Sequence, residues 1–490
     1  MINTLINELL NYGLQKNILA KENYSYTANV LIDFFGEKEF SKEEIAPRDI
    51  DAILDDMATY ALTQGLLKND DIVSIDNFKA KVVDFLIDKP QEVIRKFYAY
   101  YAEDSRCATD YLYELSKNTN YIQTKRIAQN IKWKHKTEYG IIDLTINLSK
   151  PEKDPRLIAL QKMSQSGYPK CQLCKENEGY RGHIGYDARS NMRIIPMKLN
   201  NEEWFFQYSP YSYFNEHCIV LNKDHVPMII NRATFIKLLE FLDYFPEYFI
   251  GSNAGLPVVG GSILNHEHYQ GGKYHFPIES AEAEYIATIE GVEVYRVVWP
   301  LTTIRIKSDD RNKIIDFAEK IFNAWQDYEN RDLMIYNSKD DIHNTITPIA
   351  RKDGKTYVFD LIFRNNYVTA EFPDGVFHPH ANLHHIKKEN IGLIEAMGLG
   401  VLPPRLKTEF ALIARFLQGD NSVLHDEKLI KHQDWIEEIQ PQYDGKQDVN
   451  TFILEEAGKV FSNVLKDAGV FKLDEAGIKA FLEFIHQAIK

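Results

Sequence analysis

The sequence predicts an α+β protein in which two related halves, built mainly from antiparallel strands, are flanked by helical segments. Apolar residues recur near helical spacing up to about residue 150. Short strand-like runs then alternate with single amphipathic helices up to residue 402, and helical spacing returns after Pro403-Pro404. Because 490 residues exceed one ordinary hydrophobic core, more than one domain is expected.

The first segment, residues 1–150, is expected to be mostly helical. Its helical stretches are Ile2–Tyr12, Ala28–Gly36, Ile50–Gly65 and Phe78–Ala102. Pro90 fits the first turn of a helix, where the N–H that proline lacks has no partner within the helix. No chemical motif occurs in this segment, so its expected role is packing or assembly.

Residues 151–285 form the first expected half. Strands are predicted at Met192–Pro196, Trp204–Gln207 and His217–Leu221. An amphipathic helix at Arg232–Tyr244 and a strand at Tyr248–Ile250 follow, and a strand rich in histidine comes next. This strand is expected to carry the functional site.

A similar order of elements recurs over residues 286–402, the second expected half, although sequence identity between the halves is slight. The predicted strands are Val292–Val298, Thr302–Ile306, Leu333–Tyr336, Thr345–Ala350 and Thr356–Phe363. The last two form a hairpin around Asp353-Gly354, and the helix of this half covers Asp310–Tyr328. Residues 403–490 are predicted to be helical.

Composition excludes several classes of protein. The net charge of −14 argues against a surface for nucleic acid or an anionic membrane. No run of 18 apolar residues predicts a membrane helix, and the first residues lack the basic and apolar regions of a secretory signal. With only four cysteines there is no disulfide framework, so a cytoplasmic location is expected.

The segment from Gly260 to Gly272 contains the most informative pattern in the chain. His266, His268 and Gln270 alternate, so in an extended strand they project from one face. Imidazole is a nucleophile that titrates near neutrality, and an amide can donate to an oxyanion. The alternative is a chance pair of histidines on a polar strand. Flanking glycine pairs favour catalysis, because they allow another backbone or a ligand to approach closely. Glu267 is expected to point away from this face and to take no catalytic part.

A second pattern, Cys171-Gln172-Leu173-Cys174, has the spacing of metal ligands but supplies only half of a site. Its surroundings do not suggest a redox motif. The alternative is a pair of unbonded cysteines in a turn. The candidates that complete a site are His183, His225 and His266.

Four segments together resemble the galactose-1-phosphate uridylyltransferases, in particular their second, bacterial class within the histidine-triad superfamily. They are Tyr208–Leu221, Gly260–Ser262, His266–Gly272 and His384–Gly398. The similarity runs the whole length of the chain. It implies two histidine-triad-like halves and a homodimer.

The resemblance implies a ping-pong exchange between UDP-glucose and galactose 1-phosphate, which gives UDP-galactose and glucose 1-phosphate. His268 would attack the α-phosphorus and carry the uridylyl group, while Gln270 would steady a phosphoryl oxygen. Asn253 and Ser262 match positions that contact the uridylyl and phosphate groups. Glu395 would accept hydroxyls of the hexose.

The resemblance also implies metal sites. A structural zinc would be held by Cys171, Cys174, His225 and His266. A second metal, iron or zinc, would be held by Glu284, His343, His378 and His380. The alternative for this second set is that its rings line the cleft for the sugar phosphate.

Two other functions fit the same residues. A nucleotide phosphorylase or hydrolase of the superfamily would use the same histidine but pass the nucleotide to phosphate or water. A noncatalytic nucleotide-sugar binding protein would keep the zinc and form no covalent intermediate. Replacing His268 separates an enzyme from such a binding protein.

Overall fold

In the computed structural model of this chain, the residues described are 1–149, 167–183, 186–261 and 263–490. Ser262, a predicted substrate contact, therefore lies outside the described residues. The chain divides into two compact units. The first comprises Met1–Ala128, Pro151–Ser212 and Glu216–Val226, and the second comprises Gln129–Lys150, Tyr213–Asn215 and Pro227–Lys490.

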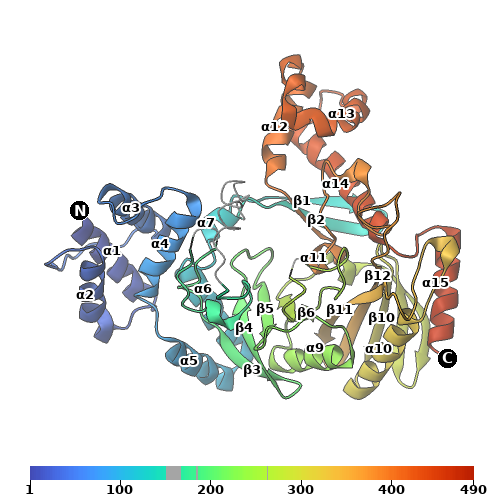
Figure 1. Ribbon diagram of the computed structural model, residues 1–490, viewed down its shortest axis with the longest axis horizontal. Coiled ribbons are helices and arrows are strands. Elements are labelled where there is room, and N and C mark those ends of the chain that lie inside the picture. The colour runs from blue at the N-terminus through green and yellow to red at the C-terminus, as the bar shows by residue number, and fades with distance from the viewer. Residues whose placement is uncertain (150–166, 184–185, 262) are drawn as a thin grey trace. The chain divides into compact units, whose positions relative to one another are not determined.

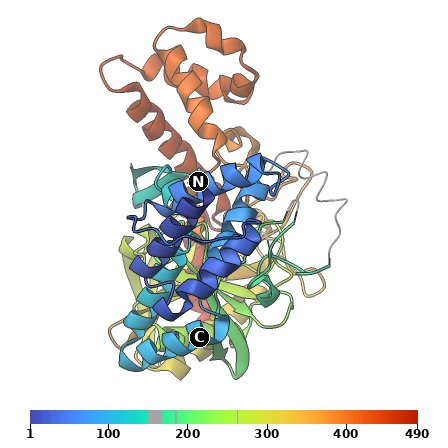
Figure 2. The same ribbon diagram turned by 90° about the vertical axis from the view of Figure 1, so that its left-hand side faces the viewer.

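Helices dominate the beginning of the first unit (Figure 2). They are α1 (Ile2–Gln15), α2 (Tyr24–Phe34), α3 (Ile50–Thr63), α4 (Ile72–Asp84), α5 (Pro90–Glu103), α6 (Ser105–Asn118) and α7 (Thr124–Ile127). Pro90 occupies the first turn of α5, as predicted. Side-chain caps begin several of these helices; the Asp71 carboxylate, for example, accepts from the backbone N–H groups of Val73 and Ser74.

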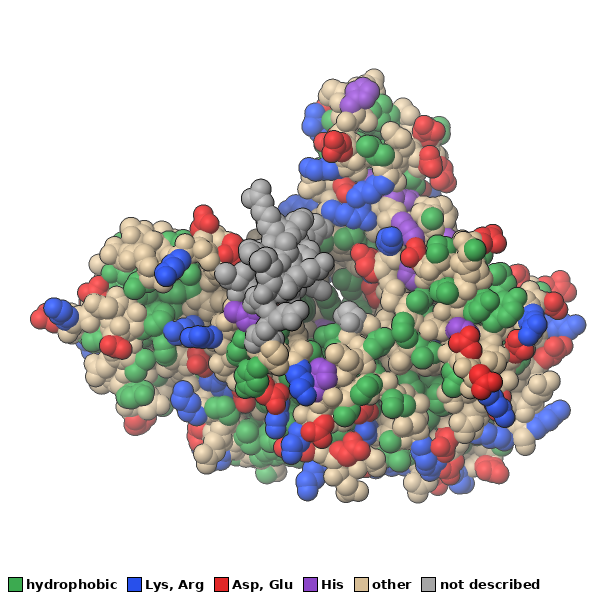
Figure 3. Space-filling model, in the orientation of Figure 1, with side chains coloured by type: hydrophobic (Ala, Val, Ile, Leu, Met, Phe, Trp, Pro, Cys, Tyr) green, Lys and Arg blue, Asp and Glu red, His purple; other side chains and the backbone are tan. Residues whose placement is uncertain are grey.

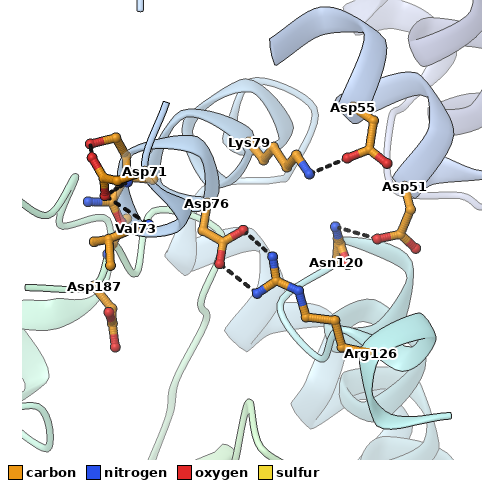
Figure 4. A network of polar contacts seen from close by, with 12 residues as sticks. Asp51, Asp55, Asp71, Val73, Asp76, Lys79, Asn120, Arg126 and Asp187 are labelled. Carbon is orange, nitrogen blue, oxygen red and sulfur yellow. Dashed lines mark hydrogen bonds and ion pairs between the residues drawn. The ribbon is translucent and has the colours of Figure 1, made fainter. Parts of the chain in front are cut away.

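Polar contacts tie α4 to its neighbours (Figure 4). The Arg126 guanidinium forms a bidentate pair with the Asp76 carboxylate at 2.7 and 2.8 Å. Lys79 of α4 pairs with Asp55 of α3. Parallel donors and acceptors fix orientation as well as distance, so the Arg126–Asp76 pair sets how α7 lies against α4.

The first unit also contains three antiparallel strands in the order β3-β4-β5. Their bounds are β3 (Ile195–Leu199), β4 (Glu202–Tyr208) and β5 (Cys218–Asn222). Each of the three overlaps a predicted strand and extends beyond it by one to three residues. Tyr208 is buried at the end of β4, and its hydroxyl donates to the carbonyl of Thr109 in α6. The helices and the sheet of this unit are therefore joined through the interior.

The second unit contains a larger antiparallel sheet in the order β7-β6-β11-β12-β10-β9-β8. Its strands are β6 (Phe249–Gly251), β7 (His268–Gly272), β8 (Ala283–Ile289), β9 (Val292–Val297), β10 (Thr303–Ser308), β11 (Asn344–Asp353) and β12 (Thr356–Asn365). Two helices, α9 (Arg232–Tyr244) and α10 (Arg311–Gln326), cover one face of this sheet (Figure 1).

A smaller sheet and a group of helices complete the second unit. Strands β1 (Ile131–Thr137) and β2 (Gly140–Ile146) form a hairpin, and β13 (Leu399–Leu402) joins β2 in parallel. The helices are α11 (Leu393–Ala396), α12 (Arg405–Leu417), α13 (Gln433–Ile439), α14 (Val449–Ala468) and α15 (Glu475–Ala488). One hydrophobic cluster joins this sheet to α12 and α14.

The fold class predicted from the sequence, α+β with mainly antiparallel sheets, is confirmed. The hairpin around Asp353-Gly354 is also confirmed, and Gly354 has the positive φ of +58° that its turn requires. The strand predicted at Leu333–Tyr336 is wrong. Arg331–Leu333 is a single 3₁₀ turn, and Met334 follows in the left-handed region, which ends any extended run. The region up to residue 150, expected to be mostly helical, also contains the β1–β2 hairpin.

The surface carries both signs of charge. Figure 3 shows acidic and basic side chains interspersed on the face it presents. No helix in the described part of the chain is long and apolar enough to cross a bilayer.

A buried carboxylate links β10, β11 and β12 in the second unit. Asp360 of β12 is 0% exposed. Its oxygens accept from Arg305 at 2.6 and 3.0 Å and from Arg351 at 2.7 Å. Burial alone would raise the pKa of Asp360, but the two guanidinium groups outweigh it and hold that pKa below its ordinary value.

Replacing Asp360 by asparagine should destabilise the protein by about 3–5 kcal/mol, because the buried guanidinium of Arg305 loses its paired carboxylate and the partly buried Arg351 loses one of its two. Since folding lowers the pKa of this carboxyl, its stabilising effect is complete above the unfolded value of about 3.9 and is lost as the pH falls below it. Chemical denaturation of Asp360→Asn at neutral pH measures the loss. Asp309→Asn, at an exposed ion pair with Lys355, is the control and should change little.

Candidate functional site

Strand β7 carries the histidine pattern in the second unit. His268 begins the strand, and Gln270 pairs with Gly251 of β6. Alternation along the strand places the side chains of His268 and Gln270 on one face and that of Tyr269 on the other. The predicted strand is therefore present, although it begins at His268 and not earlier in the glycine-bounded segment.

The His268 ring is held in one tautomer. Its Nδ1 lies 2.8 Å from the backbone oxygen of His266, and because a carbonyl only accepts, Nδ1 carries the proton and donates it. The Nε2 atom then carries the lone pair. Burial lowers the pKa of His268 to about 4, so the ring is neutral at neutral pH. A neutral imidazole with a fixed tautomer has one defined nucleophilic atom.

The glycine pair before β7 is required by close packing. A Cβ on Gly260 would lie 2.4 Å from the oxygen of Ala254, and one on Gly261 would lie 2.7 Å from the amide nitrogen of Asn253. Only glycine allows this approach. The other end of the Asn253 amide, Oδ1, accepts from the backbone N–H of Leu393 at 2.9 Å. Asn253 therefore joins the loop before His268 to the segment that contains Glu395.

The carboxylate of Glu395 already accepts hydrogen bonds from two donors. Its Oε1 accepts from Lys387 at 2.7 Å, and its Oε2 accepts from the backbone N–H of Gly392 at 2.9 Å. The wholly buried Arg364 lies beneath the same segment and donates to the carbonyl of Ile391 at 2.7 Å. Burial lowers the pKa of Arg364 to about 10. Neither Lys387 nor Arg364 was predicted from the sequence: the ion pair of Lys387 with Glu395 follows no helix or strand spacing, and the partner of Arg364 is a distant backbone carbonyl.

In the first unit, a cluster of two thiols and an imidazole could bind a metal. The Sγ atoms of Cys171 and Cys174 are 3.6 Å apart, and the Sγ of Cys174 is 3.2 Å from Nδ1 of His225. The three ligand atoms lie within 4.8 Å of one another. Tetrahedral zinc with Zn–S bonds of about 2.3 Å would place two sulfurs about 3.8 Å apart, so the spacing fits zinc.

The turn that carries both cysteines is tied down by hydrogen bonds. The backbone N–H of Cys174 donates to the carbonyl of Cys171 at 3.1 Å, and that of Leu173 donates to the sulfur of Cys171 at 3.4 Å. The buried amide of Asn177 donates to both cysteine carbonyls at 2.8 and 2.7 Å. The local sequence thus shapes a turn in which both thiols point the same way.

Two further histidines, His183 and His266, are candidates for completing this cluster. His183 stacks on Tyr186, with ring centroids 5.3 Å apart, and does not belong to the metal-ligand group. His266 belongs to the second unit and is fully buried, directly before β7.

The four residues predicted to hold a second metal are not brought together. Among the residues that the structure describes, no group of three or more metal ligands includes any of them. The Glu284 carboxylate pairs with Arg296 at 2.7 Å. His343 contacts Asn366 and Asp341, His378 contacts Asn390, and His380 contacts Asp467. Each side chain has a local partner of its own, and we propose no second metal site.

Comparison with known proteins gives two family matches and many close relatives. Residues 19–227 match the N-terminal domain of galactose-1-phosphate uridyl transferase, and residues 240–427 match its C-terminal domain. A galactose-1-phosphate uridylyltransferase of Clostridium acetobutylicum is 47% identical, with 99% of this chain and 100% of that protein covered. Galactose-1-phosphate uridylyltransferase 1 of Streptococcus pneumoniae is 43% identical, with 99% and 98% covered.

One solved structure with a detectable similarity is yeast Ap4A phosphorylase Apa2. It is 10% identical, with a TM-score of 0.34, and the match covers 69% of this chain and 93% of that one.

Proposed function

This chain belongs to the galactose-1-phosphate uridylyltransferase family, and we propose that His268 carries the uridylyl group between its two half-reactions. The protein is a nucleotidyltransferase that exchanges a uridylyl group between UDP-glucose and galactose 1-phosphate. The observation that carries the proposal is the donation of Nδ1–H of His268 to the carbonyl of His266, which leaves Nε2 as the nucleophile.

In the first half-reaction, the lone pair of Nε2 attacks the α-phosphorus of UDP-glucose. A bond forms between Nε2 and phosphorus, and the bond from phosphorus to the bridging oxygen breaks. Glucose 1-phosphate leaves with that electron pair. The nucleophile has no proton to lose, since Nδ1 keeps its own throughout, and the carbonyl of His266 stabilises the cationic ring that results.

In the second half-reaction, a phosphate oxygen of galactose 1-phosphate attacks the same phosphorus. The bond to Nε2 breaks, UDP-galactose leaves, and the neutral ring is restored. Holding the uridylyl group on the protein makes each displacement effectively unimolecular, which in favourable cases lowers the barrier by about 7–11 kcal/mol. Because of the intermediate, the two anionic sugar phosphates also react in separate steps.

Other residues would position the substrates. Gln270, on the same strand face as His268, would donate its amide to a nonbridging phosphoryl oxygen. Asn253 and Ser262 would contact the uridylyl and phosphate groups. A carboxylate has about four acceptor positions, so Glu395 can accept hexose hydroxyls in addition to its bonds from Lys387 and Gly392.

We propose that the Cys/His cluster holds a structural zinc, with His266 as the fourth ligand beside Cys171, Cys174 and His225. Four protein ligands would close the coordination sphere, so zinc would fix the backbone here and take no part in the chemistry. Because His266 also supplies the carbonyl that orients His268, this anchoring would extend to the nucleophile.

UDP-glucose labelled in the uracil should transfer its label to the protein in the absence of an acceptor. Cleavage after lysine would release residues 238–273 as one peptide, which contains both His266 and His268. The label should map to His268 when the digest is kept alkaline, since phosphorus–nitrogen bonds at imidazole are acid-labile. Unlabelled protein would contradict a covalent intermediate.

The same experiment separates the alternative functions. Galactose 1-phosphate should release the label as UDP-galactose, much faster than water or inorganic phosphate releases it. Rapid release by phosphate or water would indicate a phosphorylase or a hydrolase. Binding without any labelling would indicate a noncatalytic nucleotide-sugar binding protein.

We also propose that the protein works in the cytoplasm, without nucleic-acid or membrane partners, and that it is a homodimer, as the resemblance implies. The net charge of −14 argues against nucleic-acid and anionic-membrane partners. Light scattering after size-exclusion chromatography tests the dimer.

A further inference from the structure

A trio of buried polar side chains lies behind the catalytic strand in the second unit. Glu267 is 9% exposed, Lys237 of α9 is 4% exposed and Tyr269 of β7 is 1% exposed. The ammonium of Lys237 lies 3.1 and 3.4 Å from the two carboxylate oxygens of Glu267. The hydroxyl of Tyr269 donates to Oε1 of the same carboxylate at 2.9 Å.

Two members of the trio flank the nucleophile in the sequence. Glu267 and Tyr269 are the residues on either side of His268, and alternation turns their side chains to the opposite face of the strand. One carboxylate therefore ties together the two positions that flank His268. Lys237 belongs to α9, the helix that packs against β6 and β11, so its ion pair links the same carboxylate to that helix.

Stability alone explains this arrangement poorly. Removing two charges from water is costly, and buried ion pairs often contribute little net stability compared with apolar side chains of similar size. What such a pair does supply is geometry, because a misplaced strand would leave a buried charge without its partner. Any shift of the backbone at His268 would therefore separate these buried partners and cost free energy.

We propose that Lys237, Glu267 and Tyr269 position His268 for attack on the α-phosphorus, and this inference rests on the function proposed for His268. The bond from Nδ1 to the carbonyl of His266 sets the rotation of the ring. The trio sets the position and tilt of the backbone that carries it. A displacement of about 1 Å at a reacting atom can cost about 10²-fold in rate, so a remote anchor can govern catalysis.

The test uses the double variant Lys237→Met/Glu267→Gln, which removes both charges of the pair together and nearly preserves the shape of the two side chains. We expect the single-turnover rate of protein uridylylation to fall about 10- to 100-fold. The dissociation constant for UDP-glucose should stay close to the wild-type value, because the trio lies on the face of the strand opposite to His268. Melting temperature and zinc content are measured on the same samples, since Glu267 adjoins His266.

The control is Lys466→Met/Glu138→Gln, which makes the same chemical changes at an exposed ion pair and should leave the rate unchanged. Tyr269→Phe provides a second probe. It removes only one hydroxyl, keeps the ion pair, and should lower the same rate by a smaller factor without loss of binding.

A folded double variant that is uridylylated at the wild-type rate would overturn the inference. A fall in rate accompanied by equal loss of zinc would also overturn it, because the effect would then pass through the metal. If the double variant does not fold, a wild-type rate in Tyr269→Phe decides against the inference. His268→Ala tests the underlying function separately: if that variant is still labelled, the proposed nucleophile is wrong, whatever the trio does.

Discussion

Replacing His268 by alanine is expected to lower the rate of uridylyl transfer by about four orders of magnitude or more, the loss typical of a missing nucleophile. No other group on the described face of β7 can form the covalent bond, since Gln270 offers only an amide. Binding of UDP-glucose should persist, because most contacts with the nucleotide come from other residues. Initial rates and isothermal titration calorimetry measure the two quantities.

A matched control for this variant is His275→Ala, which removes an exposed imidazole from the same unit. It should keep the wild-type rate. If His268→Ala retained most of its turnover, His268 would not be the nucleophile. If substrate binding fell in step with turnover, His268 would be a binding residue.

Replacing Cys174 by serine should release the metal and strongly reduce thermal stability. Binding to structural zinc sites contributes roughly 10–16 kcal/mol in small domains, and a serine hydroxyl is a poor replacement for a thiolate. We expect wild-type protein purified without chelators to contain about one zinc ion per chain, and the variant to contain little. Elemental analysis gives the zinc content, and calorimetry gives the melting temperature.

Cys107→Ser serves as the control, because this thiol is exposed and lies outside the cluster. It should leave zinc content and melting temperature unchanged. Wild-type zinc content in Cys174→Ser would show that the metal, if present, is bound elsewhere.

The local part of the site could be predicted from the sequence. Alternation along β7 depends only on strand geometry, so the common face of His268 and Gln270 follows from their spacing. The turn at Cys171 and Cys174 likewise depends on short-range hydrogen bonds. Glycine at position 261 correctly indicated close packing.

Partners distant in sequence could not be predicted. Glu284 suited a metal site by residue type, but Arg296, its neighbour across the β8–β9 pair, takes its carboxylate. Lys237 was indistinguishable from an ordinary polar position on an amphipathic helix, yet it is buried against Glu267. Which side chains pair in this way depends on tertiary packing, and the spacing of residues in the sequence does not reveal it.

The strand prediction failed at one place, because a single residue, Met334, has a backbone conformation that is not extended. Leu333–Tyr336 has the apolar character of a strand, but Met334 adopts a φ of +58° after a 3₁₀ turn. The side chain of Asn330 stabilises that turn by accepting from the backbone N–H of Leu333. A capping bond of this kind competes directly with extended pairing.

The amide of Asn253 has a mechanical consequence. It packs against Gly261 and accepts from the backbone N–H of Leu393, which lies 140 positions after Asn253 in the chain. If Glu395 binds the hexose as proposed, a displacement of its segment would be transmitted through Asn253 to the loop before His268. Recognition of the hexose and alignment of the proposed attacking nitrogen would then be coupled through a single side chain.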